Sequence, residues 1–68
     1  MKKIDTCGMS CPQPVLMTKK ALGENPEGLD IVVDNSTARG NVERFLKSAG
    51  YTATITESGD TFLIEARK

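Results

Sequence analysis

The hydrophobic pattern of this chain changes its period at Gly50, and that change constrains the fold more than any other feature. Before this glycine, apolar residues recur at the spacing of one face of a helix: Ala38, Val42, Phe45, Leu46 and Ala49. After it, apolar and polar residues alternate around a Ser58-Gly59-Asp60 turn, with the apolar side chains at Tyr51, Ala53, Ile55, Phe62, Ile64 and Ala66. The sequence therefore predicts a helix that Gly50 ends, followed by a β-hairpin.

The first half of the chain predicts two strands separated by another helix. Residues 2–6 are expected to form a short strand, and residues 29–33 are a near-continuous apolar run that is typical of a strand inside a sheet. The helix is expected from Pro12 to about Leu22, with Gly23 as its stop. The stripe of this helix that should face the sheet consists of Pro14, Val15, Thr18, Ala21 and Leu22.

Together these elements predict a single domain over residues 1–68 with the order βαβαββ. The second helix should begin after Asp34-Asn35-Ser36, any of which can cap it. We expect an α/β (α+β) two-layer sandwich, in which a four-stranded mixed sheet carries two helices on one face. A chain of 68 residues has a thin core and no room for a deep pocket. Chemistry at an exposed side chain, or recognition by a surface, is therefore favoured.

Charge and hydropathy exclude several classes of function. Nine basic residues balance nine acidic ones, so the formal net charge is zero and the basic excess typical of nucleic-acid-binding proteins is missing. No stretch approaches the roughly 20 apolar residues needed to cross a bilayer, so membrane insertion is not expected. The first residues, 1–5, run into an acid and do not resemble a signal peptide. We expect a cytoplasmic protein with reduced thiols.

Cys11 is the candidate reactive group. It should occupy the N-cap of the first helix, with Pro12 at the first helical position. The unpaired N–H groups and the macrodipole of the helix would stabilise a thiolate or a persulfide anion there and lower the thiol pKa. Pro12 and Pro14 should hold the cysteine in a fixed orientation, and the amide of Gln13 could donate a hydrogen bond to the sulfur.

The rest of the composition restricts what Cys11 could do. The chain has no histidine, so a cysteine–histidine pair that attacks carbonyl groups is excluded. Thiol–sulfur exchange needs no such base. With only two cysteines, a closed zinc site is not expected, and we expect no other cofactor. A cysteine among apolar residues is often a buried small hydrophobe, so the residues alone leave both interpretations of Cys11 open.

The segment from Asp5 to Val15 resembles the signature of the TusA/SirA-like family: a glycine (Gly8), two residues, then the motif CPxP at the start of a helix. The resemblance covers essentially the whole chain, including Val33-Asp34-Asn35 and Gly50-Tyr51. It implies a two-layer α/β sandwich in which Cys11 accepts sulfane sulfur as a persulfide and passes it on. Gly8, Pro12, Gln13 and Pro14 would then shape the site.

Family membership would also imply partners. The donor would be a protein such as a cysteine desulfurase, or a thiosulfate-linked donor, and the acceptor would be another protein. Pathways in the family include tRNA thiolation, molybdenum-cofactor supply and thiosulfate uptake, and the chain could act as a sulfurtransferase or only as a carrier. The CPQP variant is most similar to the N-terminal domain of YedF-type proteins, which are associated with selenium metabolism. An alternative is a non-catalytic RNA- or protein-binding module, because the predicted layout resembles the C-terminal domain of translation initiation factor three.

Several further residues have two interpretations each. Cys7 departs from the family pattern and is either a resolving thiol or a substitution at a half-buried strand end. Met9 and Leu16 are expected to form an apolar rim beside Cys11 for a partner, although isolated exposed apolar residues are common. Lys19 and Lys20 could bind an anionic donor or an acidic partner, or simply be solvated. Asp34 lies at a strand end where ligands often bind, but helix capping alone would also account for it.

Overall fold

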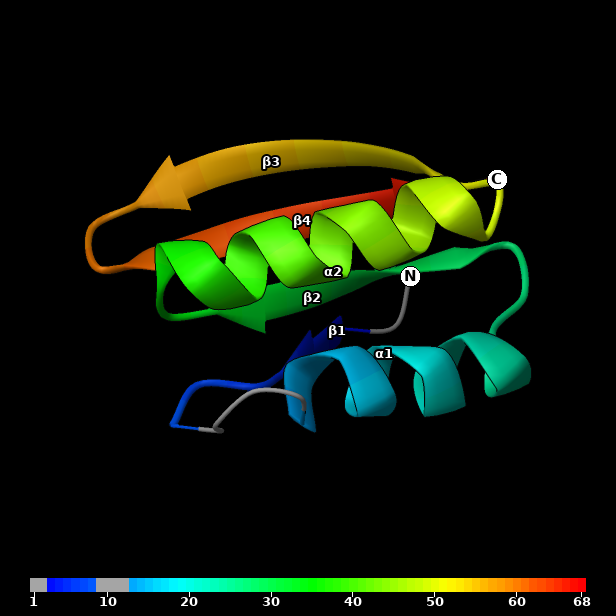
Figure 1. Cartoon of the computed structure of the whole chain (residues 1–68), viewed down its shortest axis with the longest axis horizontal. Helices are drawn as coiled ribbons and strands as arrows, with labels where there is room; N and C mark the ends of the chain where they lie inside the picture. The colour runs from blue at the N-terminus through cyan, green and yellow to red at the C-terminus, as the bar shows by residue number, and fades with distance from the viewer. Residues whose placement is uncertain (1–2, 9–12) are drawn as a thin grey trace.

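The computed structural model describes residues 3–8 and 13–68, and within them it forms one four-stranded sheet and two helices (Figure 1). In chain order the elements are β1 (Lys3–Asp5), α1 (Gln13–Glu24), β2 (Gly28–Val33), α2 (Ser36–Ser48), β3 (Thr52–Ser58) and β4 (Thr61–Arg67). The strand order is β1-β2-β4-β3; β1 is parallel to β2, and the other two pairings are antiparallel. The predicted βαβαββ order and mixed sheet are confirmed.

The core lies between the sheet and the helices. Along β2, Leu29, Ile31 and Val33 are fully buried, whereas Asp30 and Val32 are half-buried. This alternation follows from the two layers: both helices lie in front of the sheet in Figure 1, so only one face of each strand reaches the core. The prediction that residues 29–33 form an inner strand is confirmed by the place of β2 between β1 and β4.

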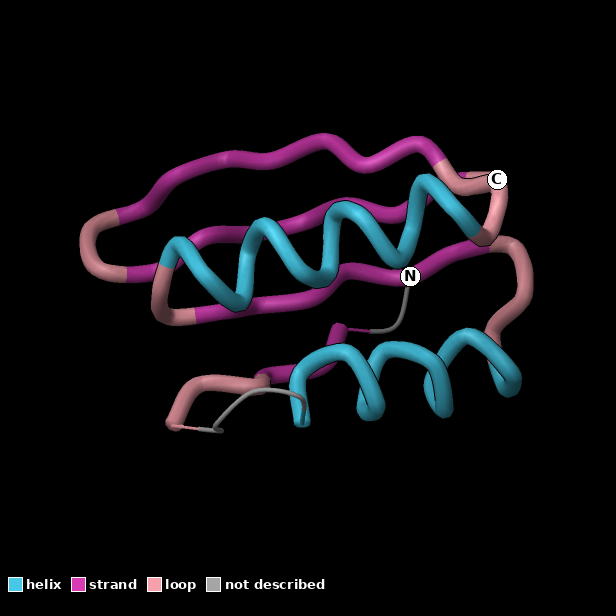
Figure 2. Tube along the Cα trace, viewed as in Figure 1, coloured by secondary structure: helices cyan, strands magenta, loops and turns pink. Residues whose placement is uncertain are grey.

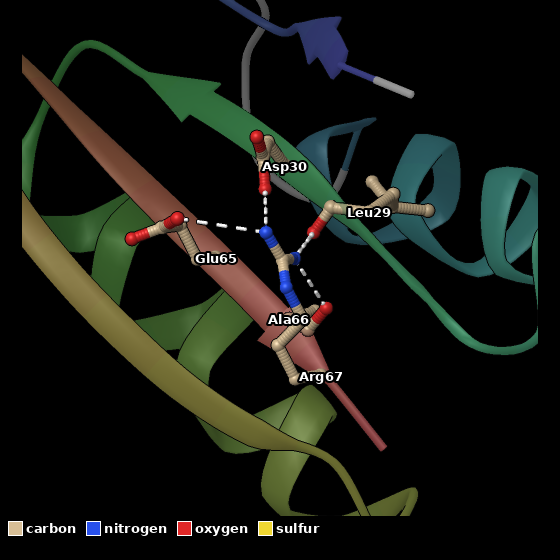
Figure 3. A network of polar contacts seen from close by, with 5 residues as sticks. All are labelled: Leu29, Asp30, Glu65, Ala66 and Arg67. Carbon is tan, nitrogen blue, oxygen red and sulfur yellow. Dashed lines mark hydrogen bonds and ion pairs between the residues drawn. The ribbon is translucent and has the colours of Figure 1, made fainter. Parts of the chain in front are cut away.

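The opposite face of the sheet, here called the open face, carries a network of charged side chains (Figure 3). The Arg67 guanidinium lies 3.0 Å from Asp30 Oδ1 and 3.5 Å from Glu65 Oε2, and it donates to the Ala66 carbonyl oxygen at 2.8 Å. Asp30 Oδ1 is buried and accepts no directed hydrogen bond, so the nearby cation is what compensates its charge. The network joins β2 to β4 on the face that the helices leave uncovered.

Helix α1 packs through the predicted stripe but ends later than expected. Its Pro14, Thr18, Ala21 and Leu22 are buried, and Val15 is half-buried. The helix continues through Gly23 to Glu24, so the predicted stop at Gly23 is wrong. The chain leaves the helix at Asn25, whose backbone and side-chain N–H groups both donate to the Ala21 carbonyl oxygen. Pro26 follows, and a proline disfavours helical backbone at the residue before it.

Helix α2 is capped by Asn35, whose side-chain oxygen accepts from the Ala38 N–H at 2.7 Å. Its buried residues are Ala38, Val42 and Leu46, and Phe45 packs partly against the same core. The expectation that Ala49 also faces the core is wrong: Ala49 is the C-cap and is exposed. The chain turns away after it, because Gly50 has a positive φ of 89° and ends the helix as predicted.

The hairpin has a tighter turn than the pattern indicated. Ser58 belongs to β3 and pairs with Thr61, so the turn itself is only Gly59-Asp60, with a positive φ at Gly59 alone. Glycine at the first turn position is typical of a type II′ turn, which matches the twist of the two strands. At the other end of β3, the buried Tyr51 donates its hydroxyl to the Pro26 carbonyl oxygen at 2.7 Å.

The loops that join these elements gather at the two ends of the sheet (Figure 2). The turn between β3 and β4 lies at the same end as the carboxyl end of β2, because Val33 pairs with Phe62. The loop between α1 and β2 lies at the opposite end, near Tyr51. Within the described residues, no helix is long and apolar enough to cross a membrane.

Candidate functional site

Three of the predicted site residues, Met9, Cys11 and Pro12, lie outside the described residues. The structure therefore describes the two segments that flank residues 9–12 in the sequence, the second of which includes the last two residues of the CPQP motif. On one side the described chain stops at Gly8, and on the other it resumes at Gln13, the first residue of α1. These two segments and their contacts make up the candidate site.

The segment that follows β1 is attached to the carboxyl end of β2. Thr6 is buried, and both its N–H and its hydroxyl donate to the Val32 carbonyl oxygen, at 2.9 and 2.7 Å. Two residues later, the Gly8 N–H donates to Asp34 Oδ2 at 2.8 Å. Gly8 has a positive φ of 82°, which favours glycine over any residue with a Cβ. The chain that enters residues 9–12 is thus tied to β2 three residues before Cys11.

Asp34 and Asn35 connect this segment to α2. The Asn35 amide donates to Asp34 Oδ1 at 3.0 Å while its oxygen caps the helix. The carboxylate of Asp34 therefore does not cap the helix. One of its oxygens accepts from Asn35, and the other accepts from Gly8, which lies 26 residues earlier. Asp34 is thus part of the candidate site. The signal for it in the sequence is a polar residue at the end of a strand that pairs in parallel with β1.

Cys7 is half-buried beside two carboxylates. Its N–H donates to Asp5 Oδ1 at 2.9 Å, and this bond is the main reason why the pKa of Asp5 is lowered. The pKa of the Cys7 thiol is raised, first by its hydrogen bond to the Asp5 carboxylate and further by desolvation and by the charges of Asp5 and Asp34. The thiolate of Cys7 is therefore disfavoured, and the thiolate is the nucleophilic form of a cysteine.

The second segment, which starts with the last two residues of the CPQP motif, begins α1. Gln13 is exposed at the start of α1, whereas Pro14 is buried and its carbonyl oxygen accepts from the hydroxyl of the buried Thr18 at 2.8 Å. Pro14 thus lies on the buried side of α1. Within residues 3–8 and 13–68, no three cysteine or carboxylate side chains are grouped so that they could hold a metal ion.

The surface of α1 carries the residues expected to contact a partner. Leu16 is 52% exposed, and Lys19 and Lys20 are exposed with it. A shallow groove of about 270 Å³ lies between β1 and α1, and its lining residues are Ile4, Met17, Lys20, Ala21 and Glu24. Lys20 thus borders an apolar groove, whereas Leu16 and Lys19 do not line it. Met9, the remaining member of the predicted surface, lies outside the described residues.

Comparisons with known proteins agree on one family. The family model described as sulfurtransferase TusA matches residues 2–68. A relative from Methanocaldococcus jannaschii is 46% identical over 63 residues, covering 90% of this chain and 84% of its own. One from Bacillus subtilis is 32% identical over 62 residues, covering 87% and 83%. Both bear the name "putative sulfur carrier protein".

A solved structure has the same fold as this chain. The crystal structure of a SirA-like protein from Desulfitobacterium hafniense superimposes with a TM-score of 0.88 and 30% sequence identity. The alignment covers 98% of this chain and 96% of the other. The two-layer arrangement of the sheet and helices is therefore shared with a protein of known structure over nearly the full length of both chains.

Proposed function

This chain belongs to the TusA family, and on that premise we propose that it is a sulfur carrier that holds sulfane sulfur as a persulfide on Cys11 and relays it to a partner protein. The observation that carries the proposal is the position of Cys11 in the sequence. It lies between Gly8, whose backbone is tied to Asp34, and Gln13, at which α1 begins. The shared name of the relatives supports sulfur transfer over RNA binding.

The chemistry is a sequence of two exchanges. The Cys11 thiolate attacks the outer sulfur of a donor persulfide; a new S–S bond forms on Cys11, the S–S bond of the donor breaks, and the donor leaves as a thiolate. A thiolate of the acceptor then attacks the outer sulfur on Cys11, which regenerates the Cys11 thiolate. No net oxidation occurs, and no general base is required. The first turn of α1, which begins two residues after Cys11, has unpaired N–H groups that favour an anion nearby.

Cys7 is assigned no step in this relay. As a resolving thiol it would attack the persulfide on Cys11, release sulfide and leave a disulfide. That attack requires a Cys7 thiolate, and the carboxylates of Asp5 and Asp34 raise the Cys7 pKa and disfavour it. Cys7 is therefore proposed to remain a free thiol while Cys11 is loaded.

The partners are proposed to be a sulfur-donor protein, such as a desulfurase, and an acceptor protein in the cytoplasm. The surface available to them includes the exposed Leu16, Lys19 and Lys20 of α1, on the helix that follows the CPQP motif. An acidic partner would complement the two lysines, and an apolar side chain would cover Leu16. Selenium could replace sulfur in this scheme, because the same thiolate would carry either element.

The test is a mass measurement after treatment with a cysteine desulfurase and cysteine, or with polysulfide. The protein is expected to gain about 32 Da, one sulfur atom, and to lose it on reduction. Cys11→Ala is expected to abolish the gain, whereas the matched variant Cys7→Ala should load as the wild type does. A gain that persists in Cys11→Ala would contradict the proposal, as would its absence from the wild type. An intramolecular disulfide in the loaded wild type would show that Cys7 does resolve the persulfide.

A further inference from the structure

The two edges of the sheet are protected to different degrees. Proteins guard exposed strand edges with short strands, charges, prolines or bulges, because an open edge can pair with another strand. The edge strand β1 has three residues, and two of them, Lys3 and Asp5, are exposed and charged. At the other edge β3 has seven, and residues 52–56 include no charge, proline or glycine. The only charged residue of β3 is Glu57.

β3 is regular along its whole length. It pairs with β4 without a bulge from Thr52 to Ser58, and in the described part of the chain no strand pairs with its other side. Figure 1 shows that side of β3 at the margin of the molecule, away from β4. Ala53 and Ile55 are only half-buried, so the helix layer leaves part of their apolar surface uncovered.

The turn determines which backbone groups of β3 are free. In a two-residue hairpin, the two residues that close the turn exchange backbone hydrogen bonds; here they are Ser58 and Thr61. From this pair onward, successive residues of the strand point their backbone N–H and C=O alternately toward the partner strand and away from it. Every second residue of β3 before Ser58 therefore turns its N–H and C=O away from β4. These outward-facing residues are Ala53, Ile55 and Glu57.

The outward edge is complementary to itself. When two copies of β3 run antiparallel about a twofold axis at Ile55, the outward groups of Ala53 meet those of Glu57 from the other copy, and Ile55 meets its own equivalent. Thr54 then lies opposite Thr56 of the other copy. No like charges are opposed, and β-branched pairs of this kind stabilise adjacent strands.

We propose that this chain forms a homodimer through antiparallel pairing of the two β3 strands, with the twofold axis at Ile55. The result is one continuous eight-stranded sheet with both helix layers on the same face. A single pair of edge strands buries less than the roughly 1,200 Å² of standard stable interfaces, so the dimer is weak and depends on concentration. The zero formal net charge adds no long-range repulsion.

The dimer leaves the sulfur site accessible. Gly8 and Asp34 lie beside β1 and β2, on the opposite side of the sheet from the β3 edge. Formation of the dimer does not depend on Cys11, so its test is independent of the proposed sulfur transfer. Excess reductant in every sample prevents disulfide-linked dimers from being counted.

The experiment is sedimentation equilibrium from about 10 µM to about 1 mM. The mass of the wild type is expected to rise from that of one chain, 7.3 kDa, toward twice that value. Replacing Thr54→Lys together with Thr56→Lys places lysines directly opposite each other across the proposed interface, and this variant should remain monomeric. The matched variant, Thr54→Lys with Thr56→Glu, places opposite charges there and should restore the dimer. Both positions are exposed in the single chain, and circular dichroism checks that each variant folds.

Each outcome bears on the proposal. A wild type that stays monomeric to about 1 mM overturns it. A double-lysine variant that dimerises like the wild type shows that another surface is used and also overturns it. Failure of the lysine–glutamate variant to recover the dimer contradicts the register about Ile55. Binding of β3 by a strand of a different protein, with no dimer of this chain, would likewise count against it.

Discussion

The thiol of Cys7 illustrates how strongly individual side chains decide reactivity in this chain. It lies two residues beyond the end of β1, where the Asp5 carboxylate accepts a hydrogen bond from the Cys7 N–H and also interacts with the thiol. A negative charge beside a thiol disfavours the thiolate, so the pKa rises. Cys11, four residues later, is proposed to have the opposite environment at the start of α1. The two cysteines should therefore differ in reactivity although they are close in sequence.

The pH dependence of alkylation tests this difference for Cys7. In a Cys11→Ser background, the thiolate of Cys7 should form at higher pH in the folded protein than in the unfolded chain, because the folded-state pKa is raised. Iodoacetamide should therefore label Cys7 slowly at neutral pH, and the rate should rise steeply only in the alkaline range. Asp5→Asn keeps an oxygen for the Cys7 N–H but removes the charge, so it should shift the rate profile to lower pH.

Mass spectrometry of the labelled protein gives the rate at each pH, and the urea-unfolded protein provides the reference profile. The prediction fails if the folded Cys11→Ser variant is labelled at lower pH than its own unfolded form. It also fails if Asp5→Asn leaves the profile unchanged, because the Asp5 carboxylate is the principal cause of the raised pKa.

At the scale of the elements, the order and type of the helices and strands could be predicted because the hydrophobic period is a local property of the sequence. The ends of the elements could not. Gly23 is a good helix stop by residue type, yet α1 continues past it, and contacts of Asn25 together with Pro26 end the helix. Ala49 matches the helical period, but the helix has ended before it.

The candidate site, like the elements, could be predicted only in part from the sequence. Cys11 and its prolines could be identified from a short motif, whereas the role of Asp34 could not. Its contact with Gly8 spans 26 residues, and it depends on the parallel pairing that brings the ends of β1 and β2 together. A local pattern that already explains Asp34 as a possible cap contains no sign of that contact. Long-range polar contacts of this kind require the assembled sheet.

Gly28 and Gly40 allow a matched test of where the backbone requires glycine. Gly28 begins β2 with a φ of 133°, and a Cβ placed there would lie 2.2 Å from the Ala66 carbonyl oxygen. Gly40 lies inside α2, and a Cβ there would have no atom within 4 Å apart from its chain neighbours and the backbone of its own helix. Gly28→Ala should therefore lower the free energy of unfolding by more than about 1 kcal/mol. Gly40→Ala should raise it by up to about 1 kcal/mol, since alanine favours the helix.

Urea denaturation of both variants measures these changes through the transition midpoint. The same chemical change is made in each case, so opposite signs isolate the local backbone requirement. Equal effects at the two positions would contradict the assignment of Gly28 as a position that only glycine can occupy.

At the scale of the whole molecule, two long-range hydrogen bonds tie the chain together at opposite ends of the sheet. Asp34 accepts the Gly8 N–H at the end where the CPQP motif follows in sequence, and Tyr51 donates to Pro26 at the other end. The first bond joins residues that are 26 positions apart in the sequence, and the second joins residues that are 25 apart. The first is exposed and the second is partly buried, so the second should contribute more to stability.

Removing each bond separately should show which bond affects stability and which affects sulfur transfer. Tyr51→Phe loses one partly buried hydrogen bond and should lower the free energy of unfolding by about 1 kcal/mol, with no change in the rate at which Cys11 is loaded. Asp34→Ala should cost less stability but slow the loading, because the segment that leads to Cys11 loses its attachment to β2. Asp34→Asn retains an acceptor oxygen for Gly8 and should recover most of the rate. Loading kinetics by mass spectrometry, compared with urea midpoints, separate the two effects. Equal loading rates in Asp34→Ala and Tyr51→Phe would show that the attachment of Gly8 has no part in presenting the sulfur site.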